Sequence, residues 1–409
     1  MKNWKKSSLL LFGLGFSVLG NWIYFVAINI IVLDMTGSPA AIAGLFVLRP
    51  LAMLITNLWS GSMIDRVNVR HLMIVVDIIR GILILGILFL SSVWSIYVLV
   101  FIINVFGAFF GPSSSVYITK AIPGEDKQRF NSMMSMINSS AFLTGPAISG
   151  LLIANVGVHV CIIINGVSFI VCAIAIFFLP DVDSNSRNVR APLSLKMIIS
   201  DLRLVIDFSK TARFFIVVYL LFQASMLIVY AIDSQEVAFI RIHLDLTEVD
   251  YGYIISVTGV GSLVGSSIAA LVAKKVHYRW YLGLGLLLGT VFYIAFYASF
   301  NFLTAAASFT LLGFFMAFSG SGFTTFFQKC VPADIMGRFS SVADMSLGIV
   351  QILLTILVGV LADVISLQLS CLLFAGLAFI GSVMVCFKVL PSSRSVFFHA
   401  RDKEQHSSL

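Results

Sequence analysis

Long apolar segments follow one another along almost the whole of this 409-residue chain. A helix needs about 20 apolar residues to cross the hydrocarbon core of a bilayer, and about twelve segments meet that length. Composition agrees, because 59% of the residues are hydrophobic and 11% are charged, against about 45–50% and about 25% in soluble domains. The pattern predicts an all-α membrane protein whose helices lie near residues 8–33, 40–64, 72–91, 94–118, 131–155, 158–179, 214–240, 250–273, 280–298, 301–327, 340–362 and 366–388.

The basic residues gather on one side of these segments. If the N-terminus is cytoplasmic, every Lys and Arg falls in a cytoplasmic segment except Arg49 and Arg80, inside apolar segments, and Arg241, in an outer loop. The positive-inside rule therefore predicts a multi-pass protein of the cell (inner or plasma) membrane with both termini in the cytoplasm. The basic pI of about 9.2 follows from this topology and gives no reason to expect a nucleic-acid partner. The first apolar run is longer than a signal-peptide core of about 7–15 residues, so we expect an uncleaved first helix.

The chain divides into two halves around one long polar stretch. We predict a six-helix bundle over residues 1–180, a cytoplasmic linker over 181–212, a second six-helix bundle over 213–390 and a cytoplasmic tail over 391–409. The linker is expected to carry a short amphipathic helix around Leu195 to Phe208. A sequence repeat favours two parallel, pseudo-symmetric halves: Ala108, Phe109, Gly111, Lys120, Pro123, Arg129, Phe130 and Ser132 match Ala317, Phe318, Gly320, Lys329, Pro332, Arg338, Phe339 and Ser341.

Residue patterns for catalysis or for a metal are missing from the sequence. The five cysteines lie in apolar segments or at a segment end, without a Cys-x-x-Cys pair, and the histidines are scattered. No nucleophile with a base and no phosphate-binding loop is present. We therefore expect no enzyme activity, no cofactor, no metal site and no disulfide framework.

The loop between the second and third predicted helices carries the most specific motif. Gly61-Ser62-Met63-Ile64-Asp65-Arg66 is followed by Arg70 and His71. This run resembles the Gly-x-x-x-Asp-Arg-x-x-Arg signature of the major facilitator superfamily, whose members are secondary transporters. The resemblance implies a latch at the cytoplasmic side, in which Asp65 faces the start of the eleventh helix; the latch residues would be Gly61, Asp65, Arg66, Arg70 and Asp344. Val67-Asn68-Val69 departs from the family pattern.

A second motif lies in the fifth predicted helix, at Thr144-Gly145-Pro146-Ala147-Ile148-Ser149-Gly150. Pro removes a backbone donor and kinks a helix, while Gly and Ser allow tight helix packing. The run resembles the Gly-Pro-x-x-Gly-Gly motif of drug:proton antiporters, with Gly145, Pro146 and Gly150 kept and Ser149 in place of one glycine. It favours export. The arginine that the best-known drug exporters carry in the fourth helix is missing from Ile102-Ile103-Asn104-Val105-Phe106-Gly107.

Further short matches point to one branch of that superfamily. The segments Leu19-Gly20-Asn21, Asp34-Met35-Thr36-Gly37-Ser38-Pro39, Asp65-Arg66-Val67-Asn68 and Asp77-Ile78-Ile79-Arg80-Gly81 look like the twelve-helix branch that includes macrolide-efflux and siderophore exporters. The resemblance implies proton-driven export and leaves the cargo open, because the branch also resembles lysophospholipid flippases.

Charges inside apolar segments mark functional positions, since an unpaired charge at the bilayer centre costs about 2.5–3.5 kcal/mol on insertion scales. Asp77 and Arg80 stand one helical turn apart, and their simplest interpretation is a structural ion pair. Asp233 and Glu236 have the same spacing near the outer end of the seventh segment. Two neighbouring carboxylates raise each other's pKa, as a proton carrier requires. We therefore predict proton coupling at Glu236, assisted by Asp233, with Arg49 as the candidate counter-charge; the alternative is that the two acids only begin the outer loop.

Aromatic residues with a few polar neighbours would suit a cavity for bulky amphipathic or cationic molecules. The candidates for such a substrate cavity are Asn21, Trp22, Phe25, Asn29, Phe109, Tyr219, Phe222, Gln223 and Met226.

Taken together, the sequence predicts a secondary transporter that works as a monomer and exports hydrophobic compounds, such as macrolide-like drugs, by proton antiport with alternating access. Such a protein would contribute to multidrug efflux and antibiotic resistance. A siderophore or lysophospholipid exporter of the same fold is the alternative within transporters. A membrane receptor that binds without transporting is the alternative from another class.

Overall fold

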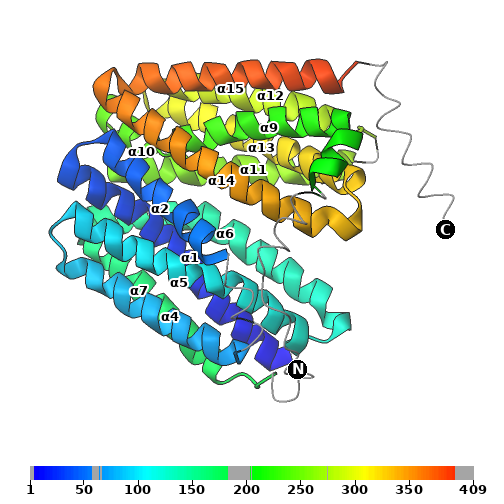
Figure 1. Cartoon of the computed structure of the whole chain (residues 1–409). Helices are drawn as coiled ribbons and strands as arrows, with labels where there is room; N and C mark the ends of the chain where they lie inside the picture. Colours follow the sequence, from blue (N-terminus) through cyan, green and yellow to red (C-terminus); the bar gives the residue numbers. More distant parts are fainter. Residues whose placement is uncertain are drawn as a thin grey trace. The chain divides into compact units, whose positions relative to one another are not determined.

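The computed structural model describes residues 4–57, 64, 67–182, 203, 205–273 and 275–391. Within these residues, twelve helices are long and apolar enough to cross a membrane, and the described chain contains no strand. The all-helical architecture predicted from hydropathy is therefore confirmed (Figure 1). Contacts divide the chain into two compact units, residues 1–194 with 246–256, and residues 195–245 with 257–409. The predicted linker falls largely on residues 183–202 and 204, and most of the predicted tail on 392–409, all outside the described residues.

The first unit contains six long helices, in which α1 packs against α6 and α7, α4 against α5 and α7, and α2 against α5. They are α1 (Trp4–Thr36), α2 (Pro39–Asn57), α4 (Val69–Gly86), α5 (Val93–Ala121), α6 (Gly124–Val156) and α7 (Val158–Phe177), and a 3₁₀ turn, η1 (Ile87–Phe89), extends α4. Gly157, with φ of +101°, separates α6 from α7 in a backbone conformation that favours glycine.

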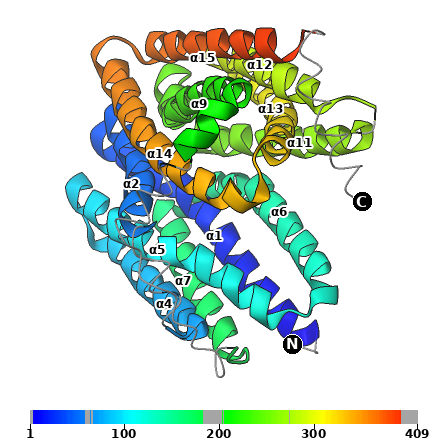
Figure 2. The same ribbon diagram turned by 45° about the vertical axis from the view of Figure 1, so that its right-hand side comes forward.

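The second unit is built from the same kind of helix, with α12 against α13 and α15, and α9 against α14 and α15. Its helices are α9 (Arg213–Asp233), α12 (Tyr278–Tyr297), α13 (Phe302–Cys330), α14 (Ala333–Val364) and α15 (Leu367–Val389), with the short α10 (Glu236–Ala238) and a π-helical turn, η2 (Phe239–His243). The helix α11 (Glu248–Val272) contributes its start to the first unit and the rest to the second. Figure 2 shows α12 and α13 running beside one another.

The sequence repeat reappears in the backbone of both units. A residue in extended conformation precedes a proline at the end of α5 and again at the end of α13: Ile122 has φ −91° and ψ 126°, and Val331 has φ −96° and ψ 123°. The residue before proline avoids the α region, so each helix ends there, and the proline then starts the next helix. The same local chemistry thus sets the α5–α6 and the α13–α14 turns.

Close helix approach in both units depends on glycine. A Cβ at Gly145 would lie 2.5 Å from the Trp22 Cβ, and one at Gly261 would lie 1.9 Å from the Thr310 backbone oxygen. Helices inside a membrane gain little from the hydrophobic effect against one another, so small residues that allow such contact stabilise the bundle.

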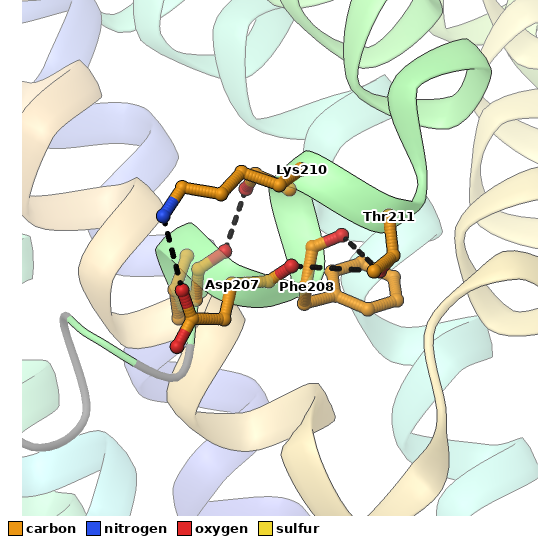
Figure 3. Close-up of polar contacts among 6 residues, drawn as sticks. Asp207, Phe208, Lys210 and Thr211 are labelled. Atoms are coloured by element: carbon orange, nitrogen blue, oxygen red, sulfur yellow. Dashed lines mark hydrogen bonds and ion pairs between the residues drawn. The ribbon is translucent and has the colours of Figure 1, made fainter.

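The segment before α9 is helical over residues 205–211 (Figure 3). Lys210 Nζ lies 3.2 Å from Asp207 Oδ1, and the Thr211 hydroxyl donates to the Phe208 carbonyl oxygen at 2.8 Å. The Phe208 ring packs against the rings of Phe215 and Phe339. The polar pair is exposed and the Phe208 ring packs inward, whereas most of the predicted amphipathic helix around Leu195 to Phe208 lies outside the described residues and stays a prediction.

Candidate functional site

The seventh apolar segment, expected as one helix over 214–240, is interrupted in the middle of its polar cluster. α9 ends at Asp233, and helix resumes at Glu236. The intervening Ser234 and Gln235 are fully buried. Ser234 Oγ donates to the Ala231 carbonyl oxygen at 2.7 Å, which gives this backbone group a partner at the break. Broken helices in membranes occur where the freed backbone is covered by protein or lines a cavity. The break therefore marks this region as a candidate site.

Two tyrosines of α12 hold the end of α9. The Tyr293 hydroxyl donates to Asp233 Oδ1 at 2.5 Å, and the Tyr297 hydroxyl donates to the Ile232 carbonyl oxygen at 2.5 Å. Tyr293 and Tyr297 stand one turn apart on α12, so they present both hydroxyls to the same neighbour. Neither tyrosine was predicted as a site residue from the sequence. Their spacing in an otherwise apolar helix was the available signal.

Asp233 and Glu236 face each other across the break. Both side chains are half-buried, and their carboxyl groups are within hydrogen-bonding reach of one another. Burial, followed by the charge of Asp233, raises the pKa of Glu236 well above its usual range. A pair of this kind holds one proton in preference to two negative charges. The structure thus brings together the two acids that the sequence proposed for proton coupling.

A cavity of about 390 Å³ within the second unit reaches Asp233. Its wall combines aromatic and methionine side chains with a few hydroxyl and amide groups, and none of its described lining residues is Lys or Arg. The lining residues are Phe222, Gln223, Met226, Val229, Tyr230, Asp233, Thr258, Ser262, Tyr293, Leu312, Gly313, Met316, Ser319, Gly320, Phe323 and Thr324. The Phe222 and Phe323 rings stack with centroids 4.0 Å apart. Such a wall can bind an apolar or amphipathic molecule next to a carboxyl group.

Three of the predicted cavity residues, Phe222, Gln223 and Met226, therefore line this cavity. Tyr219 packs instead among aromatic rings, including those of Phe215 and Phe339.

The remaining cavity candidates belong to the first unit. Phe109 and Asn29 are almost fully buried, and Asn29 Nδ2 donates to the Phe25 carbonyl oxygen at 2.7 Å. Asn21, Trp22 and Phe25 are half-buried on α1. The Trp22 ring contacts the rings of Phe25 and Phe142. A role in substrate binding stays a prediction for these residues.

The first unit contains the intramembrane pair. Asp77 is fully buried, and its Oδ1 lies 3.5 Å from Arg80 Nη1, so the structure brings these two residues together. The Arg80 guanidinium also lies 3.9 Å from the Phe169 ring centroid. Arg49 is exposed on α2. Its predicted pairing with Glu236 stays a prediction.

The signature loop is only partly covered, because Gly61, Asp65 and Arg66 lie outside the described residues. Arg70 stands at the start of α4, and its side chain reaches the end of α7: its Nε donates to the Ile176 carbonyl oxygen at 3.2 Å and its Nη2 to the Phe177 carbonyl oxygen. A cation at a helix C-terminus is stabilised by the orphan carbonyls and the helix dipole. Asp344 is exposed on α14, and its predicted latch role stays a prediction.

Asn68, within the departure from the signature, has a defined structural role. Its Oδ1 accepts from the His71 backbone N–H at 3.0 Å and so caps α4, while its Nδ2 donates to Asp181 Oδ2 at 2.8 Å. The Tyr117 hydroxyl donates to the Pro180 carbonyl oxygen at 2.8 Å. Pro180 and Asp181, which follow α7, are therefore held by hydrogen bonds from Asn68 at the start of α4 and from Tyr117 near the end of α5.

The Gly-Pro motif of α6 packs on two sides within the first unit. Ser149 Oγ donates to the Ile23 carbonyl oxygen of α1 at 2.8 Å. On the other side, a Cβ at Gly150 would lie 2.8 Å from the Glu248 backbone oxygen, and the Ala147 N–H donates to Ser256 Oγ at 3.0 Å. The motif thus permits close contact of α6 with α1 and with the start of α11.

Twelve helices of membrane-spanning length in the described part of the chain, a broken helix with paired acids and an apolar cavity are features expected of a multi-pass membrane transport protein. Family comparison agrees, because the model of the Major Facilitator Superfamily matches residues 10–238 and 237–408. The chain belongs to this superfamily and is a transporter, which confirms the expectation that it is not an enzyme.

Relatives of known sequence cover nearly the whole chain. It is 25% identical over 401 residues to the "Uncharacterized MFS-type transporter YfiS" of Bacillus subtilis, across 96% of this chain and 95% of that protein. It is 24% identical over 390 residues to the "Putative bacilysin exporter BacE" of Bacillus amyloliquefaciens, across 92% and 94%.

Solved structures share the fold at lower identity. A mutant of the nucleoside transporter NupG aligns with a TM-score of 0.74 at 14% identity, covering 94% of this chain and all of that one. A bacterial homolog of the human lysosomal transporter Spinster, inward-facing and unoccupied, aligns with a TM-score of 0.69 at 14% identity, covering 94% and 98%.

Proposed function

We propose that this transporter exports hydrophobic or amphipathic compounds from a bacterial cell by proton antiport with alternating access. The observation that carries the proposal is the carboxyl pair Asp233 and Glu236, held by Tyr293 at the edge of an apolar cavity. A carboxyl group at such a site exchanges a proton more readily near neutral pH than an exposed one. The cavity gives an apolar molecule a place beside that group.

Export as the direction of transport is supported by the Gly-Pro motif and by the similarity to BacE. The packing of Gly150 against α11 shows why the motif needs small residues here. The name of BacE refers to bacilysin, so bacilysin belongs with dyes and macrolides among the compounds to be tested. Siderophores and lysophospholipids are the second class of cargo. The proposal includes cytoplasmic termini, which the distribution of Lys and Arg supports, and a monomer as the functional unit.

The first test measures efflux of a hydrophobic cationic dye, a macrolide and bacilysin from cells that express the protein, with and without a protonophore. The proposal predicts export of at least one compound that the protonophore abolishes. Export that is insensitive to the protonophore would contradict proton antiport. If none is exported, siderophores and lysophospholipids are tested next, and a chain that binds but moves none of these compounds would be a receptor.

The second test assigns the proton site in proteoliposomes with an imposed pH gradient. Asp233→Asn and Glu236→Gln are expected to bind substrate but to lose most of the gradient-driven transport. Asp245→Asn is the matched control, because Asp245 is a nearby exposed acid whose φ of 52° asparagine also tolerates. Retained gradient-driven transport in both Asp233 and Glu236 variants would show that the coupling group lies elsewhere.

A further inference from the structure

A second cavity lies at the end of the second unit, away from the acid pair. It has a volume of about 450 Å³ and is formed where α11 ends, α12 begins and α13 ends. Three long membrane-crossing helices terminate together there, so the cavity is at the membrane–water boundary. Neither the proposed transport site nor the sequence motifs account for it.

The charged groups of this cavity are basic. Lys275 and Lys329 line it, and its described lining residues include no Asp or Glu. Lys329 Nζ lies 4.9 Å from the centroid of the Tyr278 ring, which holds the ammonium group at the cavity wall. Ser321 and Thr325 of α13 add hydroxyl groups one helical turn apart. Two ammonium groups with hydroxyls form a surface that binds a phosphate-bearing anion.

The start of α12 strengthens this preference. Its first residues, Tyr278 and Tyr281, line the cavity, and the positive end of the helix dipole lies there. A negatively charged group at this helix end would be favoured by the dipole.

Exposed apolar side chains stand close in sequence to the lining residues of the cavity, which favours a lipid over a free anion. Leu271, shortly before Lys275, is 81% exposed, and Trp280 is 39% exposed. Leu284 and Val291 are exposed further along α12, at spacings that continue the face of Trp280. Tryptophan is enriched at the headgroup level of membrane proteins. A lipid whose headgroup enters the cavity would find apolar side chains for its acyl chains.

We propose that this cavity binds the phosphate headgroup of an anionic phospholipid, with Lys275 and Lys329 as its principal ligands. Basic pockets between transmembrane helices at the membrane surface bind such headgroups. The lipid would hold together the ends of α11, α12 and α13. This site is separate from transport chemistry, and its test requires no substrate.

The test uses the purified full chain in detergent, with lipid retention measured by native mass spectrometry during titration with phosphatidylglycerol or phosphatidylcholine. We expect tighter binding of phosphatidylglycerol. The double variant Lys275→Gln/Lys329→Gln should weaken it by roughly 25-fold, about fivefold for each lysine removed. Lys210→Gln is the matched control, because Lys210 is an exposed cation of the same unit that pairs with Asp207 outside the cavity. Lys329→Arg keeps the charge and should retain the lipid.

Competition separates the two sources of phosphate. Inorganic phosphate and glycerol phosphate at millimolar concentration should not displace phosphatidylglycerol if the apolar surface contributes. Displacement by these ions, or stabilisation of the protein by them without any lipid preference, would overturn the lipid assignment. Equal binding of the two lipids, or a double variant that binds like Lys210→Gln, would overturn the site.

Discussion

Replacement of Gly261 by alanine tests whether backbone contact between α11 and α13 shapes the transport cavity. A Cβ at this position would lie 1.9 Å from the Thr310 backbone oxygen, whereas real Cβ contacts are essentially never below 3.0 Å. The helices must therefore separate by about an ångström. Ser262 Oγ, which donates to the Gly313 carbonyl oxygen at 3.2 Å, would lose that bond. Ser262 and Gly313 both line the cavity, so its shape changes with the packing.

The magnitude follows from three contributions. Overpacking costs about 1–3 kcal/mol, and the lost hydrogen bond about 1 kcal/mol. Alanine in a helix returns up to about 1 kcal/mol relative to glycine. The net loss of unfolding free energy is about 1–3 kcal/mol, which would lower the thermal midpoint by about 1–4 °C on the per-residue relation known for soluble domains.

The assay is thermal unfolding of the purified chain in detergent, alongside substrate binding. Gly376→Ala is the control, because a Cβ at Gly376 meets no atom within 4 Å, and it should leave the midpoint unchanged or slightly higher. A Gly261→Ala protein as stable as Gly376→Ala, with unchanged substrate affinity, would refute the packing argument.

Three further substitutions address the acid pair and the α4 cap. Tyr293→Phe removes the hydroxyl that donates to Asp233. Because a hydrogen bond to a charged group contributes about 1.5–3 kcal/mol, the pH profile of initial transport rates should move by about 1–2 units to higher pH. An unshifted profile would count against the role of Tyr293. Because the pKa of Glu236 is raised in the folded protein, folding binds its proton more tightly, and stability should fall as the pH rises from the unfolded value through the folded one. In thermal midpoints measured from pH 4 to 9, Glu236→Gln should depend less on pH than the unmodified protein. Parallel curves for the two proteins would exclude Glu236 as the source of the pH dependence. Asn68→Ala removes the α4 cap and the hydrogen bond to Asp181, and the free energy of unfolding in denaturant should fall by about 1–2 kcal/mol. Asp181→Asn keeps the cap, so it should lower that free energy by less. A larger loss for Asp181→Asn than for Asn68→Ala would contradict this account.

Hydropathy predicted the spanning helices because the bilayer requires apolar length, and the same property explains where the prediction of helix ends fell short. The apolar run near 131–155 belongs to a helix, α6, that begins at Gly124, and the run near 340–362 to α14, which begins at Ala333. Helical hydrogen bonding continues beyond the hydrocarbon, where polar side chains are solvated. An apolar run therefore marks the bilayer thickness and not the limits of the helix.

Only those features of the candidate site that depend on the spacing of residues along the sequence could be predicted. Two acids three residues apart identify a shared helix face, but the interruption of the helix between Asp233 and Glu236 depends on tertiary contacts. Tyr293, the partner of Asp233, is distant in sequence, and tyrosine in a membrane helix has many other uses. Arg70 illustrates the same limit, because the resemblance assigns it only to a cytoplasmic latch, whereas its side chain donates to backbone carbonyls at the end of α7.

The two units surround their intramembrane acids differently, and this difference supports the proposed place of coupling. Asp77 has a cation one turn away: its Oδ1 lies 3.5 Å from Arg80 Nη1, and the Arg80 guanidinium lies 3.9 Å from the Phe169 ring centroid. Asp233 and Glu236 have each other and the Tyr293 hydroxyl, and no Lys or Arg is among the described residues that line the neighbouring cavity. An uncompensated acid pair at the edge of an apolar cavity must take up a proton or a cationic group to become stable. The cavity lies beside the Asp233 carboxyl, so the proposed exchange of a proton for a substrate would take place within the second unit.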